Sequence, residues 1–308
     1  MRFAVFQDSM KGGRPSNQDR IGYSYSREAL ILILADGMGG HVQGEVAAEI
    51  AVRVIMSRFE RAAKPTIRKP VDFLNEALMA AHRAIEDYAF EHGMFESPRT
   101  TCVACLVQND HAWWAHAGDS RLYLFRRGAL LAQTRDHSRV QHLIDAGIIS
   151  AKAAADHPER NKIYSCLGGS ITPQIDVSPE MPLRKGDTFV LSSDGFWAQL
   201  AQEEIADAVK SVSVLNAMPN LMKLAAARGG MTSDNISVVA VTWENPEFAD
   251  EVSTISTETM PLDVVTTQLS GPLSERRGSS DDVTDAEIEK AILEIQEAIR
   301  RYGKDNGN

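Results

Sequence analysis

Residues 29–45 read ALILILADGMGGHVQGE, and this stretch decides what kind of fold the chain can adopt. Its first seven residues are apolar, which is typical of a strand. The run ends in Asp36 and Gly37, and a helical pattern begins at Gly44. An aspartate beside a glycine offers a carboxylate and a bare carbonyl, the oxygen ligands that hard cations prefer. Alone, the motif is also compatible with a plain glycine turn.

The same arrangement recurs further along the chain. Asp194 follows a second apolar strand, Asp234 precedes a third, and Asp119 lies between two more. If these carboxylates converge with that of Asp36, their mutual repulsion would raise their pKa values unless divalent cations neutralise them. We therefore predict that the four aspartates meet around metal ions.

Secondary-structure patterns predict an α+β protein. Helical periodicity is clearest at 44–58, 71–91 and 216–227. Strand patterns occur at 3–8, 21–24, 30–35, 101–107, 112–117, 121–125, 188–192 and 236–242. The short links between residues 101 and 125 favour antiparallel pairing over repeated parallel crossovers.

A polar segment, RPSNQD, precedes the second of these strands and contains Arg14 and Asp19. An arginine can hold a phosphate through two parallel hydrogen bonds, and Asp19 could hold a metal-bound water. A solvated loop is the alternative interpretation of this segment.

Composition excludes several classes of protein. The 308 residues are 44% apolar and 24% charged, and the formal net charge of −10 argues against a general nucleic-acid binder. No apolar run approaches the roughly 20 residues needed to span a membrane, and the first residues lack a secretory pattern. Together with an odd number of cysteines, three, these features predict a cytoplasmic protein that contacts no membrane.

Two of the cysteines, Cys102 and Cys105, lie three residues apart in the apolar stretch TTCVACLV. In a strand, side chains at this spacing point to opposite faces. We therefore expect buried cysteines rather than a metal or redox pair.

Charge divides the chain near Trp243. Residues 244–308 contain 15 acidic and 6 basic side chains and so carry most of the net charge. Residues 244–283 are rich in serine, threonine and acidic residues and have little periodicity, which predicts a linker. Residues 284–302 begin with a capping box and carry an apolar stripe, so we expect a helix that packs on its own domain, on a second copy or on a partner.

The motifs taken together, in their order, resemble those of bacterial metal-dependent serine/threonine protein phosphatases of the type 2C family. The resemblance covers residues 1–243 through RPSNQDR, ADGMGGHVQGE, the TT before Cys102, AHAGDSRLY, TRDHS, LGG, SSDG and SDNIS. It implies an αββα sandwich, with two central antiparallel sheets flanked by helices. Residues 137–169 would form the flap subdomain of that family.

The resemblance also implies roles for individual residues. Two or three Mn²⁺ or Mg²⁺ ions would be held by Asp36, the Gly37 carbonyl, Asp119, Asp194 and Asp234. Asp36 would bridge two ions, Asp119 would bind a third, Asp19 would orient metal-bound water, and Arg14 would bind the substrate phosphate.

The chain departs from the family pattern at two positions. Gln18 stands where the family often has glutamate, which removes a charge from one water-mediated metal contact. Met38 stands where eukaryotic members have a histidine proposed as general acid, so the proton donor for the leaving group is left open. His41 is a weak candidate for that role.

The implied activity is hydrolysis of phosphoserine and phosphothreonine in proteins by direct attack of a metal-bridging hydroxide, reversing a bacterial Ser/Thr kinase. The implied partners are phosphoproteins, including that kinase and its targets. An inactive relative that only binds phosphoproteins, and an enzyme for small phosphate esters, are the alternatives. A dinucleotide site is excluded, because its glycine pattern would require glycine at Val42.

Overall fold

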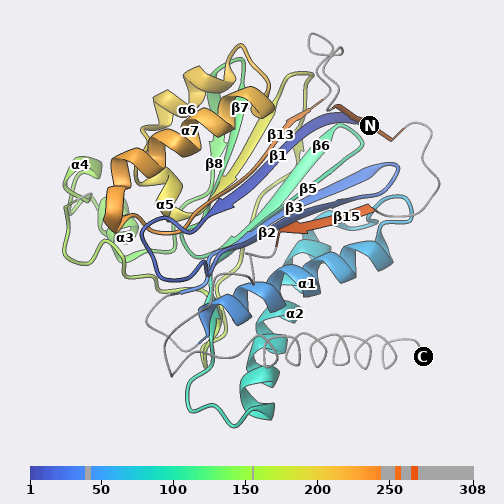
Figure 1. Ribbon diagram of the computed structural model, residues 1–308. Helices are drawn as coiled ribbons and strands as arrows, with labels where there is room; N and C mark the ends of the chain where they lie inside the picture. The colour runs from blue at the N-terminus through green and yellow to red at the C-terminus, as the bar shows by residue number, and fades with distance from the viewer. Residues whose placement is uncertain (39–42, 155, 244–253, 258–264, 270–308) are drawn as a thin grey trace, which may run out of the picture. The chain divides into compact units, whose positions relative to one another are not determined.

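Strand β3 (Ala29–Ala35) lies in the middle of one of two large antiparallel sheets (Figure 1). The computed structural model describes residues 1–38, 43–154, 156–243, 254–257 and 265–269. All seven residues of β3 are buried. Leu30, Leu32 and Leu34 pack into the core between the two sheets, and the intervening residues face the other side. Burial on both faces explains why this strand has no polar alternation.

The sheet that contains β3 has seven strands. Neighbouring strands along it are β10 (Asp176–Val177), β6 (His111–Ala117), β5 (Cys102–Gln108), β3, β2 (Arg20–Tyr25) and β15 (Val265–Leu269), and β11 (Met181–Pro182) also pairs with β6. Helices α1 (Gly44–Ala62) and α2 (Pro70–Glu91) cover its outer face (Figure 1).

The second sheet has six strands. Their order is β14 (Thr254–Ser256), β1 (Arg2–Met10), β13 (Ile236–Trp243), β12 (Thr188–Ser192), β7 (Arg121–Arg126) and β8 (Ala129–Gln133). Its outer face packs against α5 (Asp194–Trp197), α6 (Gln202–Val209) and α7 (Val214–Gly229), which is followed by a 3₁₀ turn at Gly230–Thr232. The arrangement is the αββα sandwich expected from the motifs.

The segment that follows β8 contains two short helices. Helices α3 (Arg139–Asp145) and α4 (Ala151–Ala154) lie in the range 137–169 that was expected to be a flap. The same range ends at β9 (Leu167–Gly168), which pairs with β4 (Arg99–Thr100). No helix in the described part of the chain has the length and apolar character that a membrane span requires.

The range 244–283, which the sequence predicted to be a linker, contains two strands. β14 pairs with β1, and β15 pairs with β2, so each extends a sheet at its edge. An edge strand in an antiparallel sheet needs a partner on one side only, and three to five residues give too short a pattern to recognise. The helix predicted at 284–302 lies outside the described residues.

Candidate active site

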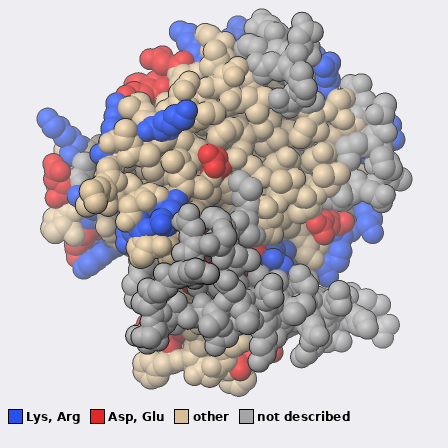
Figure 2. All heavy atoms as spheres, in the orientation of Figure 1, with Lys and Arg blue, Asp and Glu red and all other residues tan. Residues whose placement is uncertain are grey.

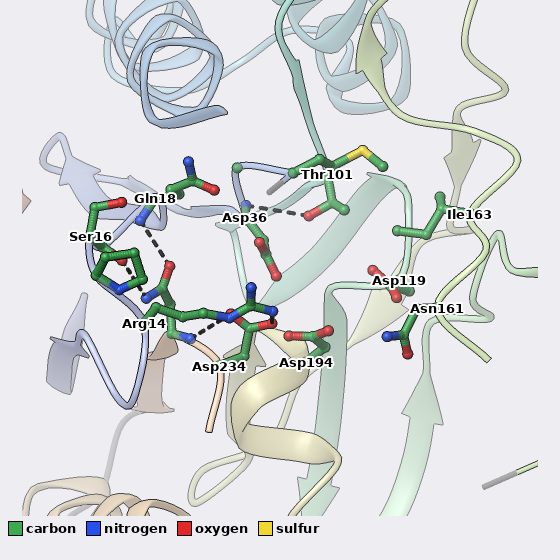
Figure 3. A pocket seen from close by; sticks show the side chains of 14 residues that line it. Arg14, Ser16, Gln18, Asp36, Thr101, Asp119, Asn161, Ile163, Asp194 and Asp234 are labelled. Atoms are coloured by element: carbon green, nitrogen blue, oxygen red, sulfur yellow. Dashed lines mark hydrogen bonds and ion pairs between the residues drawn. The ribbon is translucent and has the colours of Figure 1, made fainter. Parts of the chain in front are cut away.

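Four aspartates from distant parts of the chain line one pocket of about 320 Å³ (Figure 3). Asp36 follows β3, and Asp119 lies in the turn between β6 and β7. Asp194 follows β12, and Asp234 precedes β13. Because neighbouring strands are antiparallel, the end of one strand and the start of the next lie at the same edge of a sheet. The fold thus brings together the carboxylates that the sequence predicted would converge.

The main chain of Asp36 is fixed by the two threonines that precede Cys102. The Thr101 amide donates to the Asp36 carbonyl at 2.9 Å, and the Thr100 hydroxyl donates to the same oxygen at 2.8 Å. The Asp36 amide donates to Thr101 Oγ1 at 3.3 Å. These bonds hold the end of β3, so the carboxylate is directed into the pocket by the backbone of a buried strand.

Gly37 allows the start of α1 to cross close behind the pocket. A Cβ atom at this position would lie 2.5 Å from the backbone carbonyl of Gly44, which is closer than any side chain tolerates. Gly37 also forms an isolated bridge with Thr100 and lines the pocket. Glycine is therefore required at this position because the two backbone segments pack closely. The lack of a side chain also leaves space around the Gly37 carbonyl.

The carboxylates repel one another strongly. Burial, together with the neighbouring carboxylates, raises the pKa values of Asp36 and Asp194 well above the usual range. Burial and the nearby Asp136 raise the pKa of Asp119 to about 7. Burial raises the pKa of Asp19, which is only 1% exposed, to about 6. A site with these pKa values strongly favours any added positive charge.

The donor atoms fit divalent cations. Among the described residues, no hydrogen-bond partner faces either carboxylate oxygen of Asp19 or Oδ1 of Asp194, although all three atoms are buried. Buried oxygens without partners are costly in a folded protein unless a cation or water satisfies them. Oxygen donors in this number and charge suit Mg²⁺ or Mn²⁺ better than softer metals.

Arg14 is positioned over the pocket by its ion pair with Asp234. Its Nη2 lies 2.6 Å from Asp234 Oδ2, and the side chain is about half exposed. This hydrogen bond is the main cause of the raised pKa of Arg14. The guanidinium thus supplies positive charge at the mouth of the carboxylate cluster.

Asn235 holds the loop that carries Arg14, a role that the sequence analysis missed. Its Nδ2 donates to the carbonyls of Lys11 and Ser16 at 2.8 and 2.9 Å, and its Oδ1 accepts from the amide of Gln18 at 2.9 Å. The sequence did contain a signal for this role, namely an asparagine directly after Asp234. An asparagine side chain can donate hydrogen bonds to one segment of a loop and accept a hydrogen bond from another segment.

A second group of residues supports Asp119. The indole Nε1 of Trp197 donates to the Asp119 carbonyl at 3.0 Å. Arg121 stacks on the Trp197 ring at 3.6 Å and makes two hydrogen bonds, of 2.9 and 2.7 Å, to Asp136. These contacts join α5, which begins at Asp194, to the β6–β7 turn, which contains Asp119. They therefore fix the positions of Asp119 and Asp194 relative to each other.

The structure also shows the surroundings of Gln18 and Met38, the two positions that depart from the family pattern. Gln18 Nε2 donates to Glu45 Oε2 at 3.0 Å, so the amide contacts the carboxylate at the start of α1. Met38 lines the pocket, and its thioether carries no proton to donate. His41 lies outside the described residues.

Two residues of the expected flap reach the pocket, and the cysteines do not. Asn161 and Ile163 line it beside Asp119 (Figure 3); Asn161 ends the segment HPERN, which the resemblance placed in the flap, whereas no motif marked Ile163. Cys102 and Cys105 are buried in β5, where burial raises the pKa of both thiols, that of Cys102 to about 12. Such thiols are not nucleophiles near neutral pH.

Comparison with known proteins decides the family. The model of the family described as Protein phosphatase 2C matches residues 9–235. The chain belongs to the protein phosphatase 2C family. It is 33% identical to a putative protein phosphatase 2C-type of Streptococcus pyogenes over 236 residues, which cover 76% of the chain and 94% of that relative. It is 32% identical to the serine/threonine phosphatase stp of Listeria welshimeri, over 74% of the chain and 90% of the relative.

Solved structures of the family share the sandwich. Serine/threonine phosphatase Stp1 from Staphylococcus aureus is 31% identical and matches with a TM-score of 0.71, over 79% of this chain and 95% of that one. The catalytic domain of the serine/threonine protein phosphatase PstP, solved in complex with 2 manganese ions, is 30% identical and matches with a TM-score of 0.66, over 78% and 98%. This member of the phosphatase 2C family is a protein serine/threonine phosphatase.

Proposed function

We propose that this phosphatase hydrolyses phosphoserine and phosphothreonine esters by direct attack of water on phosphorus, with divalent cations held by Asp36, the Gly37 carbonyl, Asp119, Asp194 and Asp234. The observation that carries the proposal is the convergence of the four carboxylates with Arg14 in one pocket. The PstP catalytic domain, which shares the fold, is solved with 2 manganese ions. The buried carboxylate oxygens of Asp19 and Asp194 that have no hydrogen-bond partner among the described residues suit the same class of ion.

Divalent cations bound there would supply Lewis acidity, which lowers the pKa of coordinated water and neutralises charge on the phosphoryl oxygens. The chain's own residues perform the remaining tasks. Arg14 would turn from Asp234 to the substrate and hold two phosphoryl oxygens through parallel N–H groups. Asp19, buried beside Asp36, would accept a hydrogen bond from the attacking water and so orient it.

The pocket lining favours phosphoproteins over nucleotides as substrates. In the part of the chain that the structure describes, no aromatic side chain lines the pocket, so a base would have no ring on which to stack. The pocket opens beside flap residues Asn161 and Ile163, which could contact a peptide. We propose that the phosphoproteins are products of a Ser/Thr kinase, and that the kinase itself is among the substrates.

The test is phosphate release from a phosphothreonine peptide, measured after chelation and after return of Mn²⁺ or Mg²⁺. We expect turnover to disappear on chelation and to return with metal. Asp194→Asn should lower turnover by about a hundredfold or more, because it removes a ligand charge, whereas Asp207→Asn on the exposed side of α6 should leave it unchanged. Full activity of Asp194→Asn would refute the metal assignment. A preference for nucleotide or sugar phosphates over the peptide would refute the substrate class.

A further inference from the structure

A second cluster of metal-binding side chains lies outside the pocket. His116 is near the end of β6, and Asp176 lies directly opposite it on the neighbouring strand β10. His137 lies in the loop that leads to α3 and stacks on His116, with ring centroids 4.6 Å apart and planes inclined by 27°. One ligand atom from each residue lies within 4.8 Å of the other two. None of the three residues lines the carboxylate pocket.

His116 has the hydrogen bonding of a metal ligand. Its Nε2 lies 2.8 Å from the carbonyl oxygen of Arg135, so the ring proton must be on Nε2 and the lone pair on Nδ1. Nδ1 is buried and has no hydrogen-bond partner among the described residues. Metal-bound histidines commonly donate their second ring N–H to a backbone carbonyl, which fixes the tautomer in this way. A buried acceptor without a partner otherwise destabilises a fold.

His137 and Asp176 complete the cluster. His137 is buried, and its Nε2 lies 3.2 Å from Asp176 Oδ2 but meets no hydrogen-bond partner in suitable geometry among the described residues. The Asp176 side chain is 47% exposed, which gives an ion a route from solvent. The His137 Nδ1 accepts a long bond of 3.3 Å from the Gly118 amide. Coordination through Nε2 would place the ring proton on Nδ1 and give up this weak bond.

The protonation states suit a cation as well. Burial lowers the pKa of His116 despite its bond to the Arg135 carbonyl. For Asp176, partial burial is outweighed by the hydrogen bond from Gln174 and by the nearby His137, so its pKa lies below the ordinary value. A neutral imidazole and an ionised carboxylate are the forms that bind metals.

We propose that His116, His137 and Asp176 form a binding site for a divalent transition-metal cation of the zinc class. Two imidazole nitrogens and one carboxylate oxygen suit Zn²⁺, with water as a fourth ligand. Mg²⁺ and Ca²⁺ prefer oxygen ligands, so they would occupy the carboxylate pocket and leave this cluster free. The site is thus chemically distinct from the pocket and does not depend on the function proposed for it.

Zinc binding to the full-length protein, measured by equilibrium dialysis in excess Mg²⁺, tests the proposal. We expect Asp176→Asn, a substitution of similar shape at a half-exposed position, to weaken binding of one Zn²⁺ per chain by at least tenfold. His116→Phe, which keeps a flat ring for stacking, should abolish it. Glu180→Gln, which removes an exposed carboxylate near His111, is the matched control and should bind zinc like the original chain.

Anomalous scattering at the zinc edge from soaked crystals locates the ion independently of any variant. A peak between the two histidines and Asp176 is expected. A peak in the carboxylate pocket alone, or identical zinc titrations for the original chain and Asp176→Asn, would overturn the proposal. If His116→Phe does not fold, the scattering experiment and Asp176→Asn still decide.

Discussion

Arg14 and Asp234 form an ion pair across 2.6 Å at the mouth of the carboxylate pocket. One is the proposed phosphate ligand and the other is a proposed metal ligand. While they contact each other, the guanidinium neutralises a carboxylate that a cation would otherwise neutralise. The two proposed roles therefore compete for the same pair of side chains.

Because of this competition, we predict that Arg14→Ala lowers catalytic efficiency toward the substrate but strengthens metal binding. Loss of the guanidinium should lower kcat/KM for a phosphopeptide by about 10- to 100-fold, the range for a lost charge-assisted bond. It should also tighten Mn²⁺ binding, because Asp234 no longer has a competing cation. Steady-state kinetics and metal titration measure the two effects. Arg61→Ala, at the end of α1, is the control; weaker Mn²⁺ binding by Arg14→Ala would contradict the competition.

The hydrogen bond from Trp197 to the Asp119 carbonyl predicts a positioning role for the indole. Trp197→Phe removes the N–H but keeps a ring beneath Arg121. We expect stability to fall by about 1 kcal/mol and the Mn²⁺ concentration needed for half-maximal activity to rise several-fold. Trp113→Phe, a buried tryptophan on β6, should lose stability without changing the metal requirement. An unchanged metal requirement in Trp197→Phe would show that the bond is only structural.

The raised pKa values of the pocket predict how the metal-free protein responds to pH. Folded Asp19 and Asp119 keep their protons up to about pH 6 and about pH 7, whereas the unfolded chain releases them near 3.8. The folded state therefore binds more protons between these values, and stability contributed by these groups is lost as pH rises. In chelator, we expect Tm to fall by about 5 °C or more from about pH 4.5 to about pH 7.

The comparison with Asp119→Asn isolates this effect from other titrating groups. His116, with its lowered pKa, acts in the opposite direction but is present in both proteins. The variant should show a flatter dependence of Tm on pH, and Mn²⁺ should remove most of the difference between them near pH 7. Parallel curves for the two proteins in chelator would count against the raised pKa of Asp119.

The two edge strands predict where the chain can be shortened. A truncated chain that ends at residue 269 retains β15. In this strand the Thr266 hydroxyl contacts the Ser24 hydroxyl at 2.9 Å, and the Gln268 side chain donates to Glu49 at 2.8 Å. A chain that ends at residue 243 loses these contacts and both edge strands. We expect it to be less stable by about 2 kcal/mol or more in denaturant titration. Equal stability of the two truncated chains would show that the edge strands contribute nothing.

The sequence by itself determined the elements whose signals are local. Seven successive apolar residues specify β3, because a strand buried on both faces leaves no position for a polar side chain. The order of the aspartate motifs indicated the family, and Cys102 and Cys105 were correctly placed in a buried strand. The strand and cysteine predictions need only residues that are close together along the chain, and the family prediction needs only the order of short motifs.

Beyond the four aspartates, whose convergence the motifs predicted, only the tertiary structure decided which distant side chains meet. The pairing of Arg14 with Asp234, the loop contacts of Asn235 and the cluster of His116 with His137 depend on strand order and register, which no local pattern encodes. The edge strand β15 escaped prediction for the same reason, since its five residues acquire strand character from the partner β2. The types of the reactive side chains can thus be read from the sequence, whereas the distances between them depend on how the two sheets assemble.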